Sequence, residues 1–146
     1  MIIDFPLAES VLAAQPYSRV IGARLAVFET GTATLEIPVR DELLQHDGFV
    51  HGGVLCYAAD NAITFAAGSV LGPAVLTSGL SIDYLRPARG RTLLARAFVI
   101  HSGRRQAVCR CDVLTIGDQD TGEDAAGTLC AVAQGTVLTR QPAPQL

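Results

Sequence analysis

The chain has 146 residues, of which 49% are hydrophobic, and its 11 basic and 14 acidic side chains give a net charge of -3. This length predicts one domain, residues 1–146, which buries about two-thirds of its unfolded surface and needs neither disulfides nor a metal to fold. All basic residues are arginines, and the small negative charge argues against nucleic-acid binding. Charged residues make up only 17% of the chain, so we expect another copy of the chain to cover apolar surface.

The first residues lack the basic start of a secretory signal peptide, so we expect a cytoplasmic protein. Its four cysteines are then expected to be reduced, and no second Cys or His pair at zinc-binding spacing accompanies Cys109 and Cys111, so no metal is expected. The uncharged stretch 61–82 is long enough to cross a bilayer. Its polar residues and the Gly72-Pro73 pair favour a helix end, a turn and a strand instead, so no membrane contact is expected.

The first half of the chain predicts a short helix, a hairpin and a long helix. Residues 4–14 form the opening helix, which Pro16 breaks, and residues 20–28 and 32–37 form two strands around a turn at 29–31. The segment 54–67 is rich in alanine and free of proline, which predicts the main helix, and Gly68 stands at its expected end.

The second half predicts four antiparallel strands at 75–85, 92–100, 106–116 and 131–138. Turn signals at 87–90, 102–103 and 117–127 separate them. One apolar helix followed by a run of antiparallel strands indicates an α+β fold, in which the sheet wraps around the helix.

Arginines are concentrated in residues 61–116, which hold seven of them against two acids, whereas residues 1–60 hold three arginines and eight acids. Most are interpreted as solvated strand faces. Because a guanidinium binds phosphate oxygens in a bidentate way, one or two arginines beside the turns at Pro87 and Gly103 could form a phosphate-binding rim. The candidates are Arg86, Arg89 and Arg104.

Gly52 and Gly53 open the main helix, and Asp60 lies within it. The backbone N–H groups at a helix start have no partner in the helix, and two glycines let a ligand oxygen approach them closely, which predicts an anion or oxyanion site. The helical neighbours of Asp60 are mostly apolar, so its carboxylate either needs partners or becomes a candidate base or nucleophile. A purely structural ion pair with an arginine of the sheet is the alternative for Asp60.

The spacing of these two features has a consequence for assembly. Asp60 follows Gly52 by eight residues, which separates them by roughly 12 Å along the helix. A catalytic carboxylate and an oxyanion donor must each lie within about 3 Å of the reacting group. Both act on one substrate only if they come from two copies of the helix, related by a two-fold axis.

The run His51-Gly52-Gly53-Val54, with Asp60 nine residues after the histidine, is followed by Ser81-Ile82-Asp83-Tyr84-Leu85-Arg86-Pro87 on the next expected strand. Over residues 20–138 this pattern resembles hotdog-fold acyl-CoA thioesterases. It is most similar to the phenylacetate-pathway (PaaI-like) branch, related to 4-hydroxybenzoyl-CoA thioesterases with an acid in mid-helix. The resemblance implies hydrolysis of an aryl or medium-chain acyl-CoA by a homodimer or homotetramer, without a cofactor.

The resemblance also implies roles for single residues. Asp60 is the general base or nucleophile, and the Gly52 N–H polarises the thioester carbonyl. Gln45 takes the place of a side-chain amide at the thioester. Ser78, with Thr77 beside it, takes the place of a hydroxyl that orients water.

Substrate contacts are expected around this centre. His51 supports the loop or the substrate carbonyl, Gly53 lies beside the oxyanion site, and the acyl chain occupies an apolar slot near Val54, Tyr57 and Ala58. One carboxylate and one helix start suffice for this chemistry, because a thiol leaves readily as its anion without a strong acid.

Three other interpretations stay open. A hotdog hydratase or dehydratase could pair His46 with Asp60, although Asp60 lies two residues farther along the helix than the acid of such enzymes, roughly 200° around it. A non-catalytic acyl-thioester binding module could use the same pocket, with Asp60 only in an ion pair. A metal site from His46, His51 and Asp47 or Asp60 matches no ligand spacing with a known mechanism.

Overall fold

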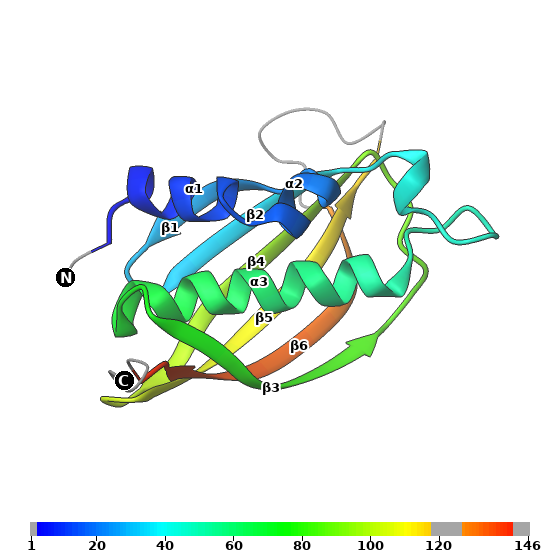
Figure 1. The fold of residues 1–146 in the computed structure, drawn as a ribbon. Helices are drawn as coiled ribbons and strands as arrows, with labels where there is room; N and C mark the ends of the chain where they lie inside the picture. Colours follow the sequence, from blue (N-terminus) through cyan, green and yellow to red (C-terminus); the bar gives the residue numbers. More distant parts are fainter. Residues whose placement is uncertain (1–2, 118–126, 142–146) are drawn as a thin grey trace.

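The structure, a computed structural model, describes residues 3–117 and 127–141. Within them, six antiparallel strands form one sheet in the order β1-β2-β4-β5-β6-β3, and a long helix, α3, lies across one face of it (Figure 1). The strands are β1 (Arg24–Glu29), β2 (Thr32–Pro38), β3 (Val75–Tyr84), β4 (Thr92–Ser102), β5 (Gln106–Ile116) and β6 (Thr128–Thr139). The α+β fold with a sheet around a central helix is confirmed. The turn expected at 117–127 lies largely outside the described residues.

Helix α3 (Gly52–Leu71) is longer than predicted. Gly68, the expected stop, lies inside the helix, which ends at Gly72. Gly72 is the residue that the helix end requires, because its φ of 99° lies in the left-handed region that glycine adopts without strain. A single glycine in a helix interior costs only about 1 kcal/mol relative to alanine, which the packing of α3 outweighs.

Three short helical segments precede α3: α1 (Phe5–Ala13), α2 (Pro16–Ile21) and the 3-10 turn η1 (Asp41–Leu43). The Asp4 carboxylate caps α1 by accepting from the Leu7 N–H at 3.0 Å. The prediction of a strand from residue 20 was wrong for its first residues, which belong to α2. Pro16 supplies the start of α2 and Gly22, with φ 84°, its end.

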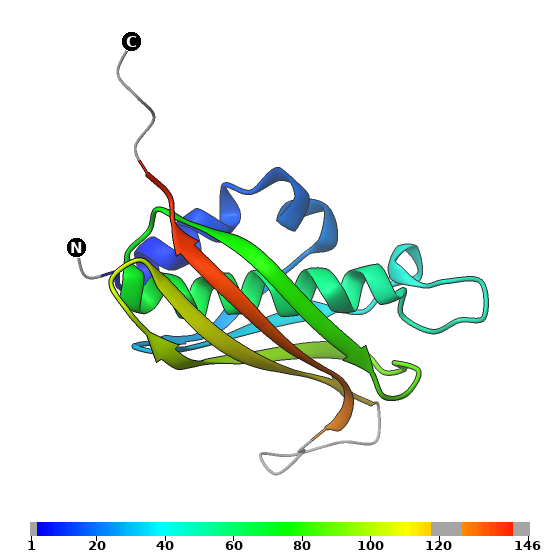
Figure 2. The ribbon, with the colours of Figure 1, turned by 90° about the horizontal axis from the view of Figure 1, so that it is seen from below.

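The core lies between α3 and the concave face of the sheet, which curves beneath the helix in the view of Figure 2. Helix α3 contacts all six strands. Small side chains on the helix let the strands approach closely, and larger ones from the sheet fill the space; fully buried examples are Ala58, Ala59, Ala62, Ala66, Ala67, Leu35, Ile37, Leu93, Val113 and Val137. By length and composition α3 could cross a membrane, but 56% of its apolar window is buried in this core.

Among the strands of the described residues, β3 forms one edge of the sheet and pairs with β6 alone. A register shift between Thr77 and Gly79 leaves Ser78 in a bulge. Successive side chains of a strand point to opposite faces, and the extra residue of the bulge reverses this alternation. Val75 and Thr77 therefore face the core before the bulge, and Leu80 and Ile82 face it after the bulge, which determines which hydroxyl reaches the helix.

Candidate active site

The side chain of His51 caps the N-terminus of α3. Its Nδ1 accepts a hydrogen bond from the Gly53 N–H at 2.8 Å, and its backbone N–H bonds to the Leu43 carbonyl at 2.9 Å. Among the described residues, no group accepts a hydrogen bond from the Gly52 N–H. The cap therefore uses one of the two glycine donors and leaves the other available to a ligand oxygen.

A depression of about 400 Å³ lies in front of this helix start. Gln45, Gly52, Tyr84 and Arg86 line it. The Tyr84 hydroxyl donates to the Gly52 carbonyl at 3.1 Å, which fixes the last residue of β3 against the first turn of α3. The structure thus brings Gly52 and the expected amide of Gln45 to one site, where the Gln45 Oε1 accepts from the Asp47 N–H.

Asp60 lies half-buried in the middle of α3 and faces the beginning of β3. Its Oδ1 accepts a hydrogen bond from the Thr77 hydroxyl at 2.7 Å. The Thr77 and Thr64 hydroxyls are 2.9 Å apart, and Thr64 also donates to the Asp60 carbonyl at 2.9 Å. The ion pairs within the described ranges join Arg24 to Glu36, Arg40 to Glu42 and His46 to Asp47, and none involves Asp60. Its carboxylate is held by one hydroxyl, that of Thr77.

Thr77, rather than Ser78, is the hydroxyl next to the carboxylate. The bulge turns Ser78 away, to an exposed position where its hydroxyl donates to the Thr136 carbonyl at 3.2 Å. The sequence analysis named both Thr77 and Ser78 as candidates for this hydroxyl. It did not name Thr64, whose hydroxyl lies next to that of Thr77. The i, i+4 spacing of Asp60 and Thr64, which puts both on one face of the helix, could have indicated it.

Within one subunit, Asp60 and Gly52 remain separate. Eight residues of helix hold them roughly 12 Å apart, and each contacts a different end of β3: Asp60 contacts Thr77, and Gly52 contacts Tyr84. The predicted separation of the two functional groups along one helix is therefore present in the fold.

Tyr57 belongs to a polar cluster at the other side of α3. Its hydroxyl lies 2.6 Å from the Ser18 hydroxyl and accepts from Asn61 Nδ2 at 3.0 Å. The Gln15 Oε1 accepts from both Ser18, at 2.6 Å, and Asn61, at 3.2 Å. Burial raises the pKa of Tyr57 above its usual range, although its hydrogen bonds oppose this. Of the expected acyl slot, Val54 lies in the core, so only Tyr57 reaches a partly open region.

The candidate arginines are divided between the two ends of the sheet. Arg86 lines the depression at the helix start, and Arg89 packs over the Phe49 ring, with 4.8 Å from its guanidinium carbon to the ring centre. Arg104 lies in the hairpin between β4 and β5, at the opposite end. Of these three arginines, Arg86 therefore lines the depression at Gly52, Arg89 lies over Phe49 in its wall, and Arg104 lies at the other end of the sheet.

The residues of the other interpretations do not converge on Asp60. His46 is exposed in the loop before α3, with Nε2 3.4 Å from Asp47 Oδ2. In the part of the chain that the structure describes, no group of three His, Cys, Asp or Glu side chains could hold a metal ion.

Comparisons with known proteins bear on the family and the fold of the chain. Residues 47–121, which include the start of α3, Asp60 and Thr77, match the model of the thioesterase superfamily. A protein of Halobacterium salinarum, named as a candidate esterase, is 34% identical over 80% of this chain and 79% of its own length. The acyl-coenzyme A thioesterase PaaI of Escherichia coli is 32% identical over 66% of this chain and 69% of its own.

A solved structure gives the same result for the fold. A thioesterase family protein from Silicibacter pomeroyi superposes with a TM-score of 0.81 at 27% identity, over 90% of this chain and 93% of that protein.

Proposed function

The chain belongs to the thioesterase superfamily and is a thioester hydrolase of the hotdog fold, and from this premise we propose that it hydrolyses an acyl-CoA to the free acid and CoA. The acyl-coenzyme A thioesterase among its relatives supports the CoA part of the substrate. The depression at the start of α3 supports it as well, since Arg86 there can pair with the nucleotide phosphates.

The proposed site is shared between two subunits of a homodimer. Asp60 of one subunit either removes a proton from the water that attacks the thioester carbonyl carbon, or attacks that carbon itself to form an anhydride that water then hydrolyses. The N–H of Gly52 of the partner subunit donates to the carbonyl oxygen as its negative charge develops. Thr77 holds the carboxylate in place through its 2.7 Å hydrogen bond. CoA leaves as a thiolate, so the site needs no strong acid.

The arrangement of β3 is the observation that carries this proposal. It is a long edge strand, with Thr77 against Asp60 near its beginning and Tyr84 against Gly52 at its end. An exposed strand edge is a template for pairing with another chain. If two copies of β3 pair antiparallel about a two-fold axis near Leu80, each Thr77 comes opposite Tyr84 of the partner subunit. Asp60 then faces Gly52 of the partner subunit.

A complementation experiment tests the shared site. Asp60→Asn removes the carboxylate, and Gly52→Pro removes the donor. Proline is tolerated at the first helical position, and His51, with φ -57° and ψ 134°, already has the conformation required before proline. A Cβ at Gly52 meets the Tyr84 ring at 3.5 Å, an ordinary contact.

Each variant alone is expected to lose thiol release from acyl-CoA substrates. Mixed dimers contain one intact site, so a random mixture should recover about a quarter of wild-type activity. Differential tags on the two variants show that mixed dimers form. Mixed dimers without recovery contradict a shared site, and activity that survives Asp60→Asn contradicts the role of Asp60. Binding of acyl-CoA by the wild type without thiol release would favour a binding module instead.

A further inference from the structure

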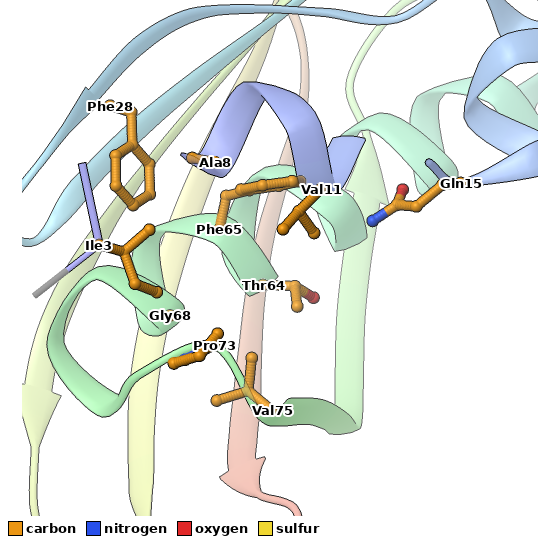
Figure 3. A pocket seen from close by; sticks show the side chains of 10 residues that line it. All are labelled: Ile3, Ala8, Val11, Gln15, Phe28, Thr64, Phe65, Gly68, Pro73 and Val75. Atoms are coloured by element: carbon orange, nitrogen blue, oxygen red, sulfur yellow. The ribbon is translucent and has the colours of Figure 1, made fainter. Parts of the chain in front are cut away.

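The two functional groups of α3 are held in place by different means. Asp60, in the middle of the helix, accepts from Thr77, and the neighbouring Thr64 borders an apolar cavity between α1 and the second half of α3 (Figure 3). Gly52 lies at the first position of the helix and has no side chain that could anchor it. Glycine is the most flexible residue and helix ends fray, so the direction of the Gly52 N–H needs support from its surroundings.

This support matters for the proposed reaction. A donor stabilises a developing oxyanion best when it already points at the oxygen, because no energy is then spent on reorientation. A displacement of about 1 Å can lower the rate of an enzyme roughly a hundredfold. The groups that hold Gly52 are therefore candidates for positioning residues.

The backbone before Gly52 is held by the loop that follows β3. In this contact the Val50 N–H donates to the Ala88 carbonyl at 2.9 Å. The His51 carbonyl accepts from the Val54 N–H at 2.9 Å, within the first turn of the helix. The peptide group between His51 and Gly52 is thus held through its oxygen, and its N–H is the donor of the proposed site.

The backbone after Gly52 is held by Tyr84. The Tyr84 hydroxyl donates to the Gly52 carbonyl at 3.1 Å, and the N–H of the same peptide group, that of Gly53, donates to His51 Nδ1 at 2.8 Å. A carbonyl oxygen has two lone pairs, so the Tyr84 bond can form without displacing a helical N–H. The Gly52–Gly53 peptide group therefore has one side-chain partner at its oxygen and another at its nitrogen.

Tyr84 is suited to this role because its backbone is fixed while its side chain is available. It is the last residue of β3 and lies opposite Ala131 of β6, and the next residue, Leu85, donates its N–H to the Cys130 carbonyl at 2.8 Å. Tyr84 is 51% exposed, and its ring would lie 3.5 Å from a Cβ on Gly52. Partial burial raises the pKa of Tyr84 above its usual range, so its hydroxyl is protonated and can donate at neutral pH.

We propose that Tyr84 is a positioning residue for the oxyanion donor: its hydroxyl holds the Gly52–Gly53 peptide group and thereby directs the Gly52 N–H at the thioester carbonyl oxygen. The inference rests on the proposed acyl-CoA hydrolysis. Because Tyr84 and Gly52 belong to the same subunit, Tyr84 serves the site that contains Asp60 of the partner subunit.

Steady-state thiol release from acetyl-, octanoyl- and benzoyl-CoA tests this role. Tyr84→Phe removes only the hydroxyl and should lower kcat for the best of these substrates roughly five- to tenfold, with KM nearly unchanged. Tyr17→Phe is the matched control. It removes another exposed tyrosine hydroxyl, on a ring that packs against Tyr57 rather than Gly52, and should keep the kinetics of the wild type.

Mixed dimers place the substitution on one subunit at a time. In a dimer of one Asp60→Asn and one Gly52→Pro subunit, the intact site uses Gly52 of the Asp60→Asn subunit. Tyr84→Phe added to that subunit should lower the recovered activity roughly five- to tenfold, whereas Tyr84→Phe added to the Gly52→Pro subunit should leave it nearly unchanged. Both dimers carry one Tyr84→Phe substitution, so a general effect on stability would be equal in them.

Nuclear magnetic resonance of the free protein tests the contact itself. Loss of the hydrogen bond in Tyr84→Phe should move the carbonyl carbon resonance of Gly52 upfield and accelerate hydrogen exchange of the Gly53 N–H. Tyr17→Phe should change neither. A Gly52 resonance that is unchanged in Tyr84→Phe would overturn the proposed contact, whatever the kinetics.

The outcomes separate the two proposals. If the wild type releases no thiol from any of these substrates, the proposed function fails, and the role of Tyr84 fails with it. If the wild type is active but Tyr84→Phe matches Tyr17→Phe in kcat, or lowers the activity of both mixed dimers equally, Tyr84 does not position the donor and the proposed function stands. If Asp60→Asn and Gly52→Pro do not complement each other, the shared site fails, and kcat and the Gly52 resonance of the Tyr84→Phe homodimer decide the role of Tyr84.

Discussion

The Thr77 hydroxyl lies 2.7 Å from Asp60 Oδ1 and joins the beginning of an edge strand to the middle of the central helix. Thr64 lies on the other side of the same hydroxyl, at 2.9 Å. A carboxylate that accepts a defined hydrogen bond is fixed in orientation, and in the proposed shared site this orientation directs it at the thioester carbonyl that the partner subunit's Gly52 polarises.

Substitutions at Thr77 are expected to act mainly on kcat. A hydrogen bond to a charged group contributes about 1.5 to 3 kcal/mol, so Thr77→Val should lower kcat by roughly ten- to a hundredfold. Thr77→Ser keeps the hydroxyl and should retain most of the activity. Ser78→Ala removes only a bond to the Thr136 carbonyl and should cost less than Thr77→Val. A larger loss for Ser78→Ala would restore Ser78 as the hydroxyl that orients water.

Removal of the His51 side chain should lower stability, because His51 Nδ1 caps α3 through the Gly53 N–H. Loss of an N-cap costs about 1 kcal/mol, so His51→Ala should reduce the urea midpoint, whereas His51→Ser, which can cap through its hydroxyl, should reduce it less. Gly53→Ala should resemble His51→Ala, since its Cβ would lie 2.9 Å from His51 Nδ1 and displace the ring. Equal stability of His51→Ser and His51→Ala would show that the cap contributes little.

Gly68 inside α3 and Gly72 directly after it should respond to alanine in opposite directions. Gly68→Ala places a Cβ in ordinary contact with Val75 Cγ2, at 3.8 Å, and should stabilise the protein by up to about 1 kcal/mol. Gly72→Ala forces a side chain onto a backbone with φ 99° and ψ 177°, and should destabilise it by about 1 to 3 kcal/mol. Thermal unfolding of both variants measures this, and a destabilising Gly68→Ala would show that α3 and Val75 do not leave room for a Cβ at this position.

The sequence predicted the elements that depend on local pattern and missed those that depend on tertiary contacts. Strands β4 and β5 begin at the predicted residues, because alternating side chains and glycine turns define them. Gly68 was taken for the end of α3 because its cost is visible in the sequence, whereas the packing that outweighs it is not. Val20 and Ile21 favour a strand by their branched side chains, yet the Pro16 start and the Gly22 end placed them in α2.

Some features of the candidate site also follow from local sequence, and others depend on tertiary contacts. The separation of Gly52 and Asp60 follows from helix geometry alone, so the sequence was sufficient for it. The choice between Thr77 and Ser78 depends on a bulge, and a one-residue shift along a strand reverses the direction of every side chain. The hydrogen bonds of Gln15 with Ser18 and Asn61 depend on α1 and α2 packing against α3, which no local pattern encodes.

Stability should fall in alkaline solution because of two buried thiols. Burial raises the pKa of Cys109 to about 11 and that of Cys111 to about 12, from an ordinary value of 9.0. Between about pH 9 and these raised pKa values, the two thiols lose their protons in the unfolded chain but keep them in the folded chain. The free energy of unfolding therefore decreases as pH rises above about 9, by up to about 1.4 kcal/mol per pH unit for each thiol, and is unaffected by these groups below about pH 8.

Urea unfolding at about pH 8 and about pH 10 measures the effect. Cys111→Ala should unfold more easily at both values, since it leaves a cavity, but its stability should decrease less between them than that of the wild type. Val113→Ala creates a cavity in the same strand without removing a thiol. It should therefore be less stable than the wild type by the same amount at both pH values, and its stability should decrease with pH as the wild type's does. If Cys111→Ala and Val113→Ala show the same dependence on pH, the buried thiols do not cause the alkaline loss.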